Sequence, residues 1–370
     1  MNFPKPFFLI LLILPFLGSF SCNKSDNQNV EPPGAVEIRD SVVAENLNFP
    51  WELVWGPDNH IWMTERGGKI SRFNPATGQV IPLLTVPEVV SNGEGGMLGL
   101  AINAEGSGSA NVFVVYNYNK NGQYTEKLVR YTYNGTALSN PVTLLDDIDA
   151  ASIHNGSRLV IDNNKIFMST GDAAEAQQAQ DINSRNGKIL RLNLDGTIPA
   201  DNPVPGNPYW SFGHRNPQGL VMANGKLYSS EHGPNNDDEI NIIQKGKNYG
   251  WPVVEGYCNT SSEETVCGTT EITEPIKAWT PTIATCGLDY YNHDLIPQWK
   301  GSLLLVALKD ARMYQLKLGD DLASIAQTNE YFAQKYGRMR DVCVSPEGKV
   351  YICTSNGGNN DKIIEITKKP

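Results

Sequence analysis

Three neighbouring stretches of the sequence hold more polar side chains and glycines than packing alone would require. They are residues 213–220 (GHRNPQGL), 230–241 (SEHGPNNDDEIN) and 246–252 (GKNYGWP). In the first stretch, Arg215 and Asn216 place several hydrogen-bond donors side by side. An anionic or carbonyl-bearing ligand needs donors in such a fixed arrangement. We therefore expect a polar ligand to bind here.

The second stretch also offers oxygen ligands for a metal ion. Gly233 and Pro234 provide two backbone carbonyls with no competing side chain, and hard cations such as calcium bind such oxygens. Asp237, Asp238 and Glu239 supply carboxylates close by. A zinc site is disfavoured, because the cysteines lack the paired spacing of zinc ligands.

The charge of the chain limits its partners. The formal net charge is −10, spread without long acidic or basic runs. Nucleic acid is not an expected partner, because phosphate binding needs clustered cations. A few well-placed cations would instead suit a small anionic ligand held in a pocket. Arg338 and Arg340 lie two residues apart, so on a strand they would point to one face.

A repeated pattern of strand, turn and strand runs through the chain and must position these residues. Each copy joins two apolar strands through a turn rich in Pro, Asp, Asn and Gly. The second strands centre near positions 62, 113, 167, 228, 304 and 351. This repeat predicts an all-β fold, a six-bladed β-propeller of four-stranded antiparallel blades, with a sandwich of unrelated hairpins as the alternative. Loops from many blades would then meet at the mouth of a central channel.

The same motifs resemble those of a known family. Residues 93–100 (GEGGMLGL), 154–159 (HNGSRL) and 187–191 (GKILR), with the polar stretches above, are similar to the soluble quinoprotein glucose dehydrogenases and the related aldose sugar dehydrogenases. The resemblance extends from about Pro50 to Ile366. It implies oxidation of an aldose at C1 to a lactone, with pyrroloquinoline quinone (PQQ) and calcium as cofactors. The electron acceptor would be external, and the sequence does not identify it.

The resemblance implies catalytic and quinone-binding roles for four residues. His154 matches the catalytic base, which removes the proton of the anomeric hydroxyl while hydride passes to the quinone; a neutral imidazole suits that task. Arg215 and Asn216 match the groups that bind the quinone oxygens, where negative charge develops. Asp172 lies where the family has an acidic residue near the active site, and it could orient His154.

Further residues match contacts to the cofactor. Lys309, Arg338 and Arg340 match cations that bind the three carboxylates of PQQ. Glu94 and His232 stand where the glucose enzymes have glutamines, and we expect both to contact the cofactor. His232 is also a second candidate base. These two departures leave the preferred sugar open. The chain is also shorter than the glucose enzymes, which trims loops at the channel mouth, and we therefore expect a broader aldose specificity.

Five residues match the calcium sites of the family. Gly233 and Pro234 match backbone carbonyls that bind the calcium ion next to the quinone, where the ion acts as a Lewis acid. Asp238, Glu239 and Tyr249 match a second, structural calcium site described near a subunit contact. A monomer and a homodimer both remain compatible with the sequence.

The first residues predict export of the protein. Residues 1–21 contain an early cation, a short apolar run and then small residues directly before Cys22, which is the pattern of a lipoprotein signal peptide. Lipid on Cys22 would hold the protein at a membrane surface. We expect a flexible tether over residues 22–38 and the catalytic propeller over residues 39–370. The expected location is that of an outer-membrane lipoprotein facing the periplasm or the cell surface.

Export permits disulfides among the other five cysteines. Cys258 and Cys267 bracket a polar loop and are expected to form a bridge. Cys343 and Cys353 flank a turn, and we expect them to face each other across a hairpin. Cys286 is then left as a buried thiol.

Two other functions remain open. Propellers can bind carbohydrate or protein without catalysis, and calcium-dependent lactonases are also six-bladed propellers. The joint presence of a candidate base and a set of cations favours the dehydrogenase, because a binding module has no need of them. The candidate base is His154, and the cations are Arg215, Lys309, Arg338 and Arg340. The channel-lining ligands of a lactonase cannot be placed in this sequence.

Overall fold

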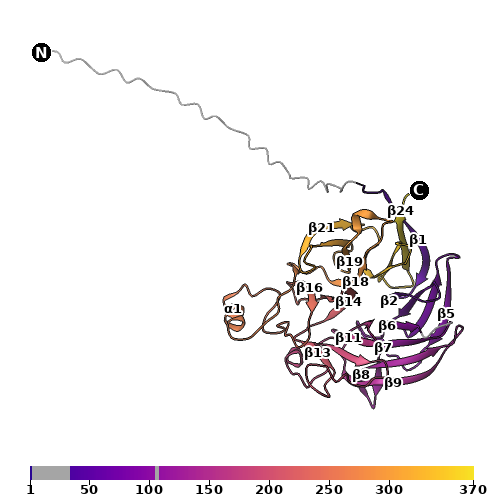
Figure 1. Ribbon diagram of the computed structural model, residues 1–370, viewed down its shortest axis with the longest axis horizontal. Helices are drawn as coiled ribbons and strands as arrows, with labels where there is room; N and C mark the ends of the chain where they lie inside the picture. The colour runs from indigo at the N-terminus through magenta and orange to yellow at the C-terminus, as the bar shows by residue number, and fades with distance from the viewer. Residues whose placement is uncertain (2–33, 105–107) are drawn as a thin grey trace. The chain divides into compact units, whose positions relative to one another are not determined.

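The computed structural model describes residue 1 and residues 34–104 and 108–370. In this part of the chain, strands run from Ile38 to Lys368 and form six four-stranded sheets. Every pair of neighbouring strands is antiparallel. Figure 1 shows the sheets arranged as blades around a common axis. The predicted six-bladed β-propeller is confirmed.

The first five blades follow the chain in order, each strand pairing with the next. The first two blades are β2 (Pro50–Trp55), β3 (Ile61–Glu65), β4 (Lys69–Asn74) and β5 (Gln79–Thr85), then β6 (Met97–Ala104), β7 (Ala110–Lys120), β8 (Gln123–Tyr133) and β9 (Leu138–Asp149). The third and fourth are β10 (Gly156–Asp162), β11 (Lys165–Thr170), β12 (Lys188–Asn193) and β13 (Tyr209–Phe212), then β14 (Pro217–Ala223), β15 (Lys226–Glu231), β16 (Asp238–Ile243) and β17 (Lys277–Trp279). The fifth is β18 (Thr285–Tyr291), β19 (Ser302–Ala307), β20 (Met313–Leu318) and β21 (Ile325–Tyr331).

The sixth blade closes the ring by joining the two ends of the propeller. It consists of β22 (Met339–Val344), β23 (Val350–Thr354), β24 (Asp361–Lys368) and β1 (Ile38–Leu47). Because β1 pairs with β24, the first strand of the fold completes the last blade. The innermost strands of the six blades pack against their neighbours all the way round, and β2 contacts β22. Ring closure buries the faces of the blades, whereas the outermost strand of each sheet keeps a free edge.

The six predicted strand centres fall on the second strands of the six blades, β3, β7, β11, β15, β19 and β23. Local sequence explains the hairpins. Ala223 pairs with Lys226 across the two-residue turn of Asn224 and Gly225, whose φ angles are 49° and 75°. A turn with positive φ at both central residues matches the twist of the flanking strands, and Asn-Gly adopts it readily.

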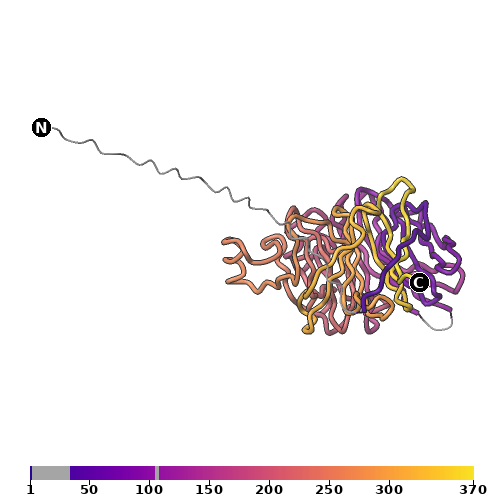
Figure 2. The backbone as a smooth tube through the Cα atoms, turned by 90° about the horizontal axis from the view of Figure 1, so that it is seen from above, coloured from indigo at the N-terminus to yellow at the C-terminus, as the bar shows by residue number. Residues whose placement is uncertain are grey.

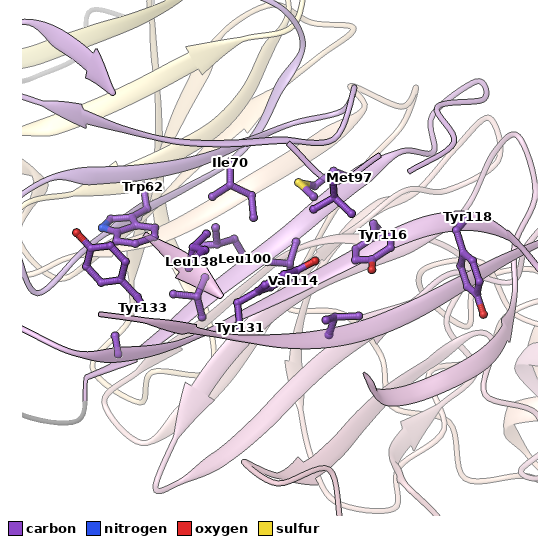
Figure 3. Packing of buried hydrophobic residues seen from close by; sticks show 14 residues of the cluster. Trp62, Ile70, Met97, Leu100, Val114, Tyr116, Tyr118, Tyr131, Tyr133 and Leu138 are labelled. Carbon is purple, nitrogen blue, oxygen red and sulfur yellow. The ribbon is translucent and has the colours of Figure 1, made fainter. Parts of the chain in front are cut away.

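The hydrophobic core is divided among the interfaces between successive blades. Side chains alternate along each second strand, so that Trp62 packs toward the second blade whereas Ile61 and Met63 pack toward the sixth. Figure 3 shows Trp62 and Tyr133 in the interface between the first and second blades. Their rings lie edge to face, with 4.7 Å between the ring centroids. Both faces of a blade are therefore buried, which explains why these strands read as continuous apolar runs.

A long connection between β16 and β17 projects from the fourth blade (Figures 1 and 2). It contains the helix α1 (Ser261–Cys267), which begins with a capping box between Thr260 and Glu263. The disulfide between Cys258 and Cys267 closes this helical loop, as predicted. Two short 3₁₀ helices, η1 (Ala176–Ala179) and η2 (Pro297–Trp299), lie in other loops.

The expectation that Cys343 and Cys353 face each other is wrong. In the register of β22 and β23, Cys343 pairs with Tyr351 and Cys353 pairs with Asp341. The two cysteines are thus diagonal neighbours, which lie about 7–8 Å apart and beyond the usual span of a disulfide. Both are free and buried, as is Cys286.

The predicted signal peptide, Cys22 and most of the predicted tether lie outside the described residues. Among the helices of the described part, none is long and apolar enough to cross a membrane. Export and lipid attachment therefore remain predictions from the sequence.

Candidate active site

The predicted site residues gather at one end of the propeller. The first strand of a blade begins, and its second strand ends, at this same end, because the two strands are antiparallel. Eight of the predicted residues lie within three positions of such a strand end. Glu94, His154, Arg215, Asn216 and Arg338 precede first strands, and Asp172, His232 and Lys309 follow second strands.

His154 and Asp172 form a hydrogen-bonded pair. The Nδ1 atom of His154 lies 2.8 Å from Oδ1 of Asp172. A carboxylate accepts, so Nδ1 carries the hydrogen and Nε2 keeps a lone pair. The His154 side chain is 14% exposed, whereas that of Asp172 is 1% exposed. This pair can therefore hold a neutral imidazole whose Nε2 atom accepts a proton from a bound molecule.

Asp172 is fixed by further donors. Its Oδ1 atom also accepts the backbone N–H of Ala174 at 2.8 Å, and its Oδ2 atom accepts the indole N–H of Trp251 at 2.9 Å. Its own backbone N–H donates to the carbonyl of Arg215 at 2.8 Å. The carboxylate is thus held between the third and fourth blades, and its orientation toward His154 does not depend on solvent.

The backbone of His154 has an uncommon left-handed conformation, with φ of 58°. Its N–H donates to Oε2 of Glu94 at 3.3 Å, and its carbonyl accepts the N–H of Ala173 at 3.0 Å. Gly171 is required beside it, because a Cβ there would lie 1.9 Å from the carbonyl oxygen of His154. The local sequence thus holds a strained backbone that turns the imidazole to its partner.

Arg215 is positioned by its backbone and by an aromatic ring. Its N–H donates to the buried carboxylate of Glu231, and its Nη1 atom donates to the carbonyl of His232 at 3.3 Å. The guanidinium carbon lies 5.3 Å from the centroid of the Trp251 ring. Trp251 therefore contacts both the partner of the candidate base and the candidate quinone-binding arginine.

Asn216 and His232 are held by main-chain groups. Oδ1 of Asn216 accepts the N–H of Gly156 at 3.1 Å, and Asn216 is buried. Nε2 of His232 donates to the carbonyl of Thr285. Burial lowers the pKa of His232, which favours the neutral ring with its lone pair on Nδ1.

Arg340 lies deeper in the channel than the other cations. Its Nη1 atom donates to Oε1 of Gln218 at 2.7 Å and lies 3.1 Å from the sulfur of Cys286. Its guanidinium carbon is 6.0 Å from the ring centroid of Trp51. The side chain is buried and its charge is fixed below the mouth of the channel.

Arg338 and Lys309 are exposed at the mouth. Arg338 is within electrostatic range of Arg340 and Glu94. The ammonium of Lys309 donates to the hydroxyl of Thr282 at 3.2 Å. The structure thus brings Arg338 close to Arg340 and Glu94.

These cations form no direct ion pairs in the described part of the chain, although carboxylates lie within electrostatic range of Arg215 and Arg338. Within the described ranges, no carboxylate forms an ion pair with Arg215, Lys309, Arg338 or Arg340. By contrast, the buried Arg158 pairs with two carboxylates at 2.7 and 2.9 Å. The Nε atoms of Arg215 and Arg340 are buried without a hydrogen-bond partner. Unpaired, partly buried cations are costly, so this end of an acidic protein suits an anionic ligand.

The carbonyls predicted to bind calcium are available. No donor in the described structure bonds to the carbonyl oxygen of Gly233 or Pro234. The N–H of Gly233 donates to Oδ1 of Asp238 at 2.9 Å, which shapes the turn after β15. The loop therefore presents two backbone oxygens of the kind that calcium binds.

The residues of the predicted second calcium site are occupied by protein contacts. Oδ2 of Asp238 accepts backbone N–H groups of residues 283–285, and Glu239 accepts a backbone N–H at 2.9 Å and an asparagine amide at 2.7 Å. Burial, and secondarily Glu231, raise the pKa of Glu239 to about 8. The Tyr249 hydroxyl bonds to the backbone, and its ring stacks on a histidine. Among the described residues, no group of three or more acidic, histidine or cysteine side chains is arranged to hold a metal, so this site remains a prediction.

Comparison with known sequences decides the family. The model of the Glucose / Sorbosone dehydrogenase family matches residues 47–365, which include strands of all six blades. The chain belongs to this family. The resemblance inferred from its motifs is confirmed.

Two relatives of the chain are named as sugar dehydrogenases. The chain is 34% identical over 413 residues to quinoprotein glucose dehydrogenase B of Acinetobacter calcoaceticus, covering 87% of this chain and 86% of that protein. It is 33% identical over 343 residues to aldose sugar dehydrogenase YliI of Escherichia coli, covering 87% of this chain and 91% of that protein. The fold resembles the PQQ-bound aldose sugar dehydrogenase of Streptomyces coelicolor, with a TM-score of 0.76, 30% identity and coverage of 90% and 99%. The fold also resembles the apo form of the aldose sugar dehydrogenase of Escherichia coli, with a TM-score of 0.79 and 30% identity. This match covers 90% of this chain and 100% of that chain.

Sequence reasoning missed two residues at this end of the propeller. Trp251 belongs to a stretch that the sequence singles out, but its contacts to Asp172 and Arg215 follow only from the fold. Arg66 directly follows β3, as His232 directly follows β15. That equivalence between blades is the signal that could have identified Arg66.

Proposed function

We propose that this protein oxidises aldoses at C1 to lactones with PQQ and calcium, and passes the electrons to an external acceptor. The observation that carries the proposal is the set of unpaired cations next to an imidazole that presents Nε2 as a proton acceptor. The relatives named as quinoprotein and aldose sugar dehydrogenases, and the PQQ-bound neighbour, support it.

The residues present fit the quinone. PQQ has three carboxylates, and Lys309, Arg338 and Arg340 would hold them. Arg215 and Asn216 would hold its carbonyl oxygens. The buried Nε atoms of Arg215 and Arg340, which have no partner among the described residues, would gain acceptors from such a ligand.

The chain supplies the base for the reaction. Nε2 of His154 takes the proton of the C1 hydroxyl, and the hydrogen on C1 leaves with its electron pair, so that the sugar loses two electrons and becomes a lactone. Bound PQQ would supply the acceptor for that hydride. Asp172 stabilises the imidazolium that forms at His154 and keeps the hydrogen on Nδ1.

Calcium and the two departures from the glucose enzymes complete the proposed site. The carbonyls of Gly233 and Pro234 would hold the ion, which would act as a Lewis acid. His232 directly precedes these two residues in the loop and would contact the cofactor from there. Glu94 holds the backbone of His154, so its carboxylate lies where it can influence the choice of sugar.

We also propose that the protein is exported and anchored through lipid on Cys22. The support is the pattern of residues 1–21 directly before this cysteine. Such an anchor would place the oxidation of sugars at a membrane surface, near membrane-bound electron acceptors.

The function is tested by reconstitution. Purified protein loaded with PQQ and calcium chloride should reduce an electron-accepting dye when an aldose is added, across a panel of mono- and disaccharides. Omission of PQQ and treatment with a calcium chelator are the controls. Protein that binds the quinone yet reduces no dye with any aldose would contradict the proposal.

A further inference from the structure

Arg66 lies at the same end of the propeller as the proposed site and has no role in it so far. It directly follows β3, and its backbone is fixed on both sides. Its N–H donates to the carbonyl of Phe49 at 3.1 Å, and its carbonyl accepts the N–H of Met97 at 3.0 Å. Gly96 permits this approach, since a Cβ there would lie 2.3 Å from the carbonyl oxygen of Arg66.

The guanidinium of Arg66 is held in one orientation. Its carbon lies 4.1 Å from the centroid of the Phe49 ring, and its Nη1 atom donates to the carbonyl of Gly93 at 2.5 Å. Its Nε atom is buried without a hydrogen-bond partner. One edge of the guanidinium, formed by Nε and Nη2, is therefore left without an acceptor in the described structure. This is an edge that can bind a carboxylate through two parallel hydrogen bonds.

Arg66, Arg338 and Arg340 form a group of three arginines with two carboxylates in range of Arg66, so the group keeps a net positive charge. Arg66 forms no ion pair with any carboxylate of the described chain, although Glu94 and Asp361 lie within electrostatic range. Burial, and then the charges of Arg340 and Arg338, lower the pKa of Arg66. A ring-stacked arginine beside two other arginines is an unfavourable arrangement unless an anion joins them.

We propose that Arg66 is a further cofactor-binding residue, which binds a carboxylate of the quinone together with Arg338 and Arg340. The inference rests on the proposed function, because it takes PQQ as the anion. It places a cation from the first blade next to those of the sixth, so that the two blades joined by ring closure both hold the cofactor. Stacking on Phe49 fixes the guanidinium in advance, which reduces the entropy lost on binding.

The test is an equilibrium titration of PQQ into apo protein with calcium present, followed by fluorescence quenching or calorimetry. Arg66→Gln should weaken binding about 10- to 100-fold, as expected for loss of a hydrogen-bonded charge pair, and Arg66→Lys should fall between that variant and the wild type. Arg130→Gln is the matched control. Arg130 is also half-buried, but it lies on β8 away from the site, and its removal should leave the affinity unchanged.

The thermal unfolding of the apo variants separates binding from a structural role. Arg66→Gln removes a charge that Arg338 and Arg340 repel, but it also removes the contacts to Gly93 and Phe49. Because these effects oppose each other, apo Arg66→Gln should unfold close to the apo wild type. Wild-type affinity for PQQ in Arg66→Gln, or weaker binding with a clear loss of apo stability, would overturn the inference while leaving the proposed function intact. Absence of PQQ binding by the wild type would overturn both.

Discussion

Replacement of Asp172 by asparagine tests how the structure controls the candidate base. The carboxylate accepts three hydrogen bonds, from His154 Nδ1 and the backbone N–H of Ala174 on one oxygen and from the indole of Trp251 on the other. An amide has only one oxygen. If that oxygen faces His154 and Ala174, the amide N–H groups face the N–H of Trp251. If the amide turns over, they face His154 and Ala174 instead.

The turned amide has a chemical consequence. His154 would then accept at Nδ1 and carry its hydrogen on Nε2, the atom that must take the proton of the substrate. A wrong tautomer of this kind costs a comparable histidine–aspartate pair about 10⁴ in turnover. The amide that is not turned still loses a charge-assisted hydrogen bond to the imidazolium, worth about 1.5–3 kcal/mol, or roughly 10- to 100-fold. We therefore expect Asp172→Asn to lose about one to four decades of kcat, depending on which way the amide turns.

The indole N–H of Trp251 allows a second test of the pair of His154 and Asp172. Trp251→Phe keeps a ring beside Arg215 but removes the N–H that conflicts with the amide of Asn. The double variant Asp172→Asn/Trp251→Phe should therefore be faster than Asp172→Asn alone, by about tenfold if the conflict costs one hydrogen bond, while Trp251→Phe alone stays close to wild type. Dye-linked turnover with a saturating aldose, measured against pH, gives the comparison. Asp172→Asn at wild-type turnover, or a double variant no faster than the single one, would refute this account of the pair.

Three further predictions follow from the site and its surroundings. His154→Ala should lower turnover by about two to four decades, as loss of a general base does, while PQQ titration shows nearly unchanged binding; full turnover would refute the assignment of the base. Lys309→Ala should weaken retention of PQQ in the same titration, and an unchanged Kd would remove Lys309 from the site. Glu126 is buried, accepts the Ser157 hydroxyl at 2.7 Å and the Asn117 amide at 3.3 Å, and burial raises its pKa from 4.5 to about 8. The folded state therefore keeps a proton that the unfolded state loses, so the free energy of unfolding should fall as pH rises from about 4.5 to about 8, by up to about 1.4 kcal/mol per pH unit. Urea unfolding of Glu126→Gln should show a weaker fall over this range, and identical slopes in both proteins would contradict the burial argument.

Much of the fold could be predicted from the sequence because the signal is local and repeated. Each hairpin carries its own turn residues, such as Asn224 and Gly225, and the repeat fixes the number of blades. The disulfide between Cys258 and Cys267 was predictable because a short polar loop joins the two cysteines. Register is set by bulges and not by turn position alone, and the shift between Met339 and Asp341 in β22 illustrates what a sequence does not show.

The site was predictable only in part. Distinctive stretches of sequence identify His154 and Arg215, but the pairing of His154 with Asp172 depends on how the third blade folds. Arg66 escaped notice because an arginine followed by two glycines at a strand end reads as an exposed turn. Its stacking on Phe49 depends on the pairing of β2 with β3, and its closeness to Arg340 comes from closing the ring, which is a long-range effect.

The central claim is that unpaired cations from separate blades converge on a small molecule with three carboxylates. Comparison of PQQ with its trimethyl ester tests it most directly, because the ester keeps the quinone but has no carboxylate charge. Calorimetric titration of both into the calcium-loaded protein should show one PQQ bound per chain and the ester at least about 100-fold weaker, since charge-assisted hydrogen bonds to several cations are lost. Equal affinities for the two compounds would contradict the claim.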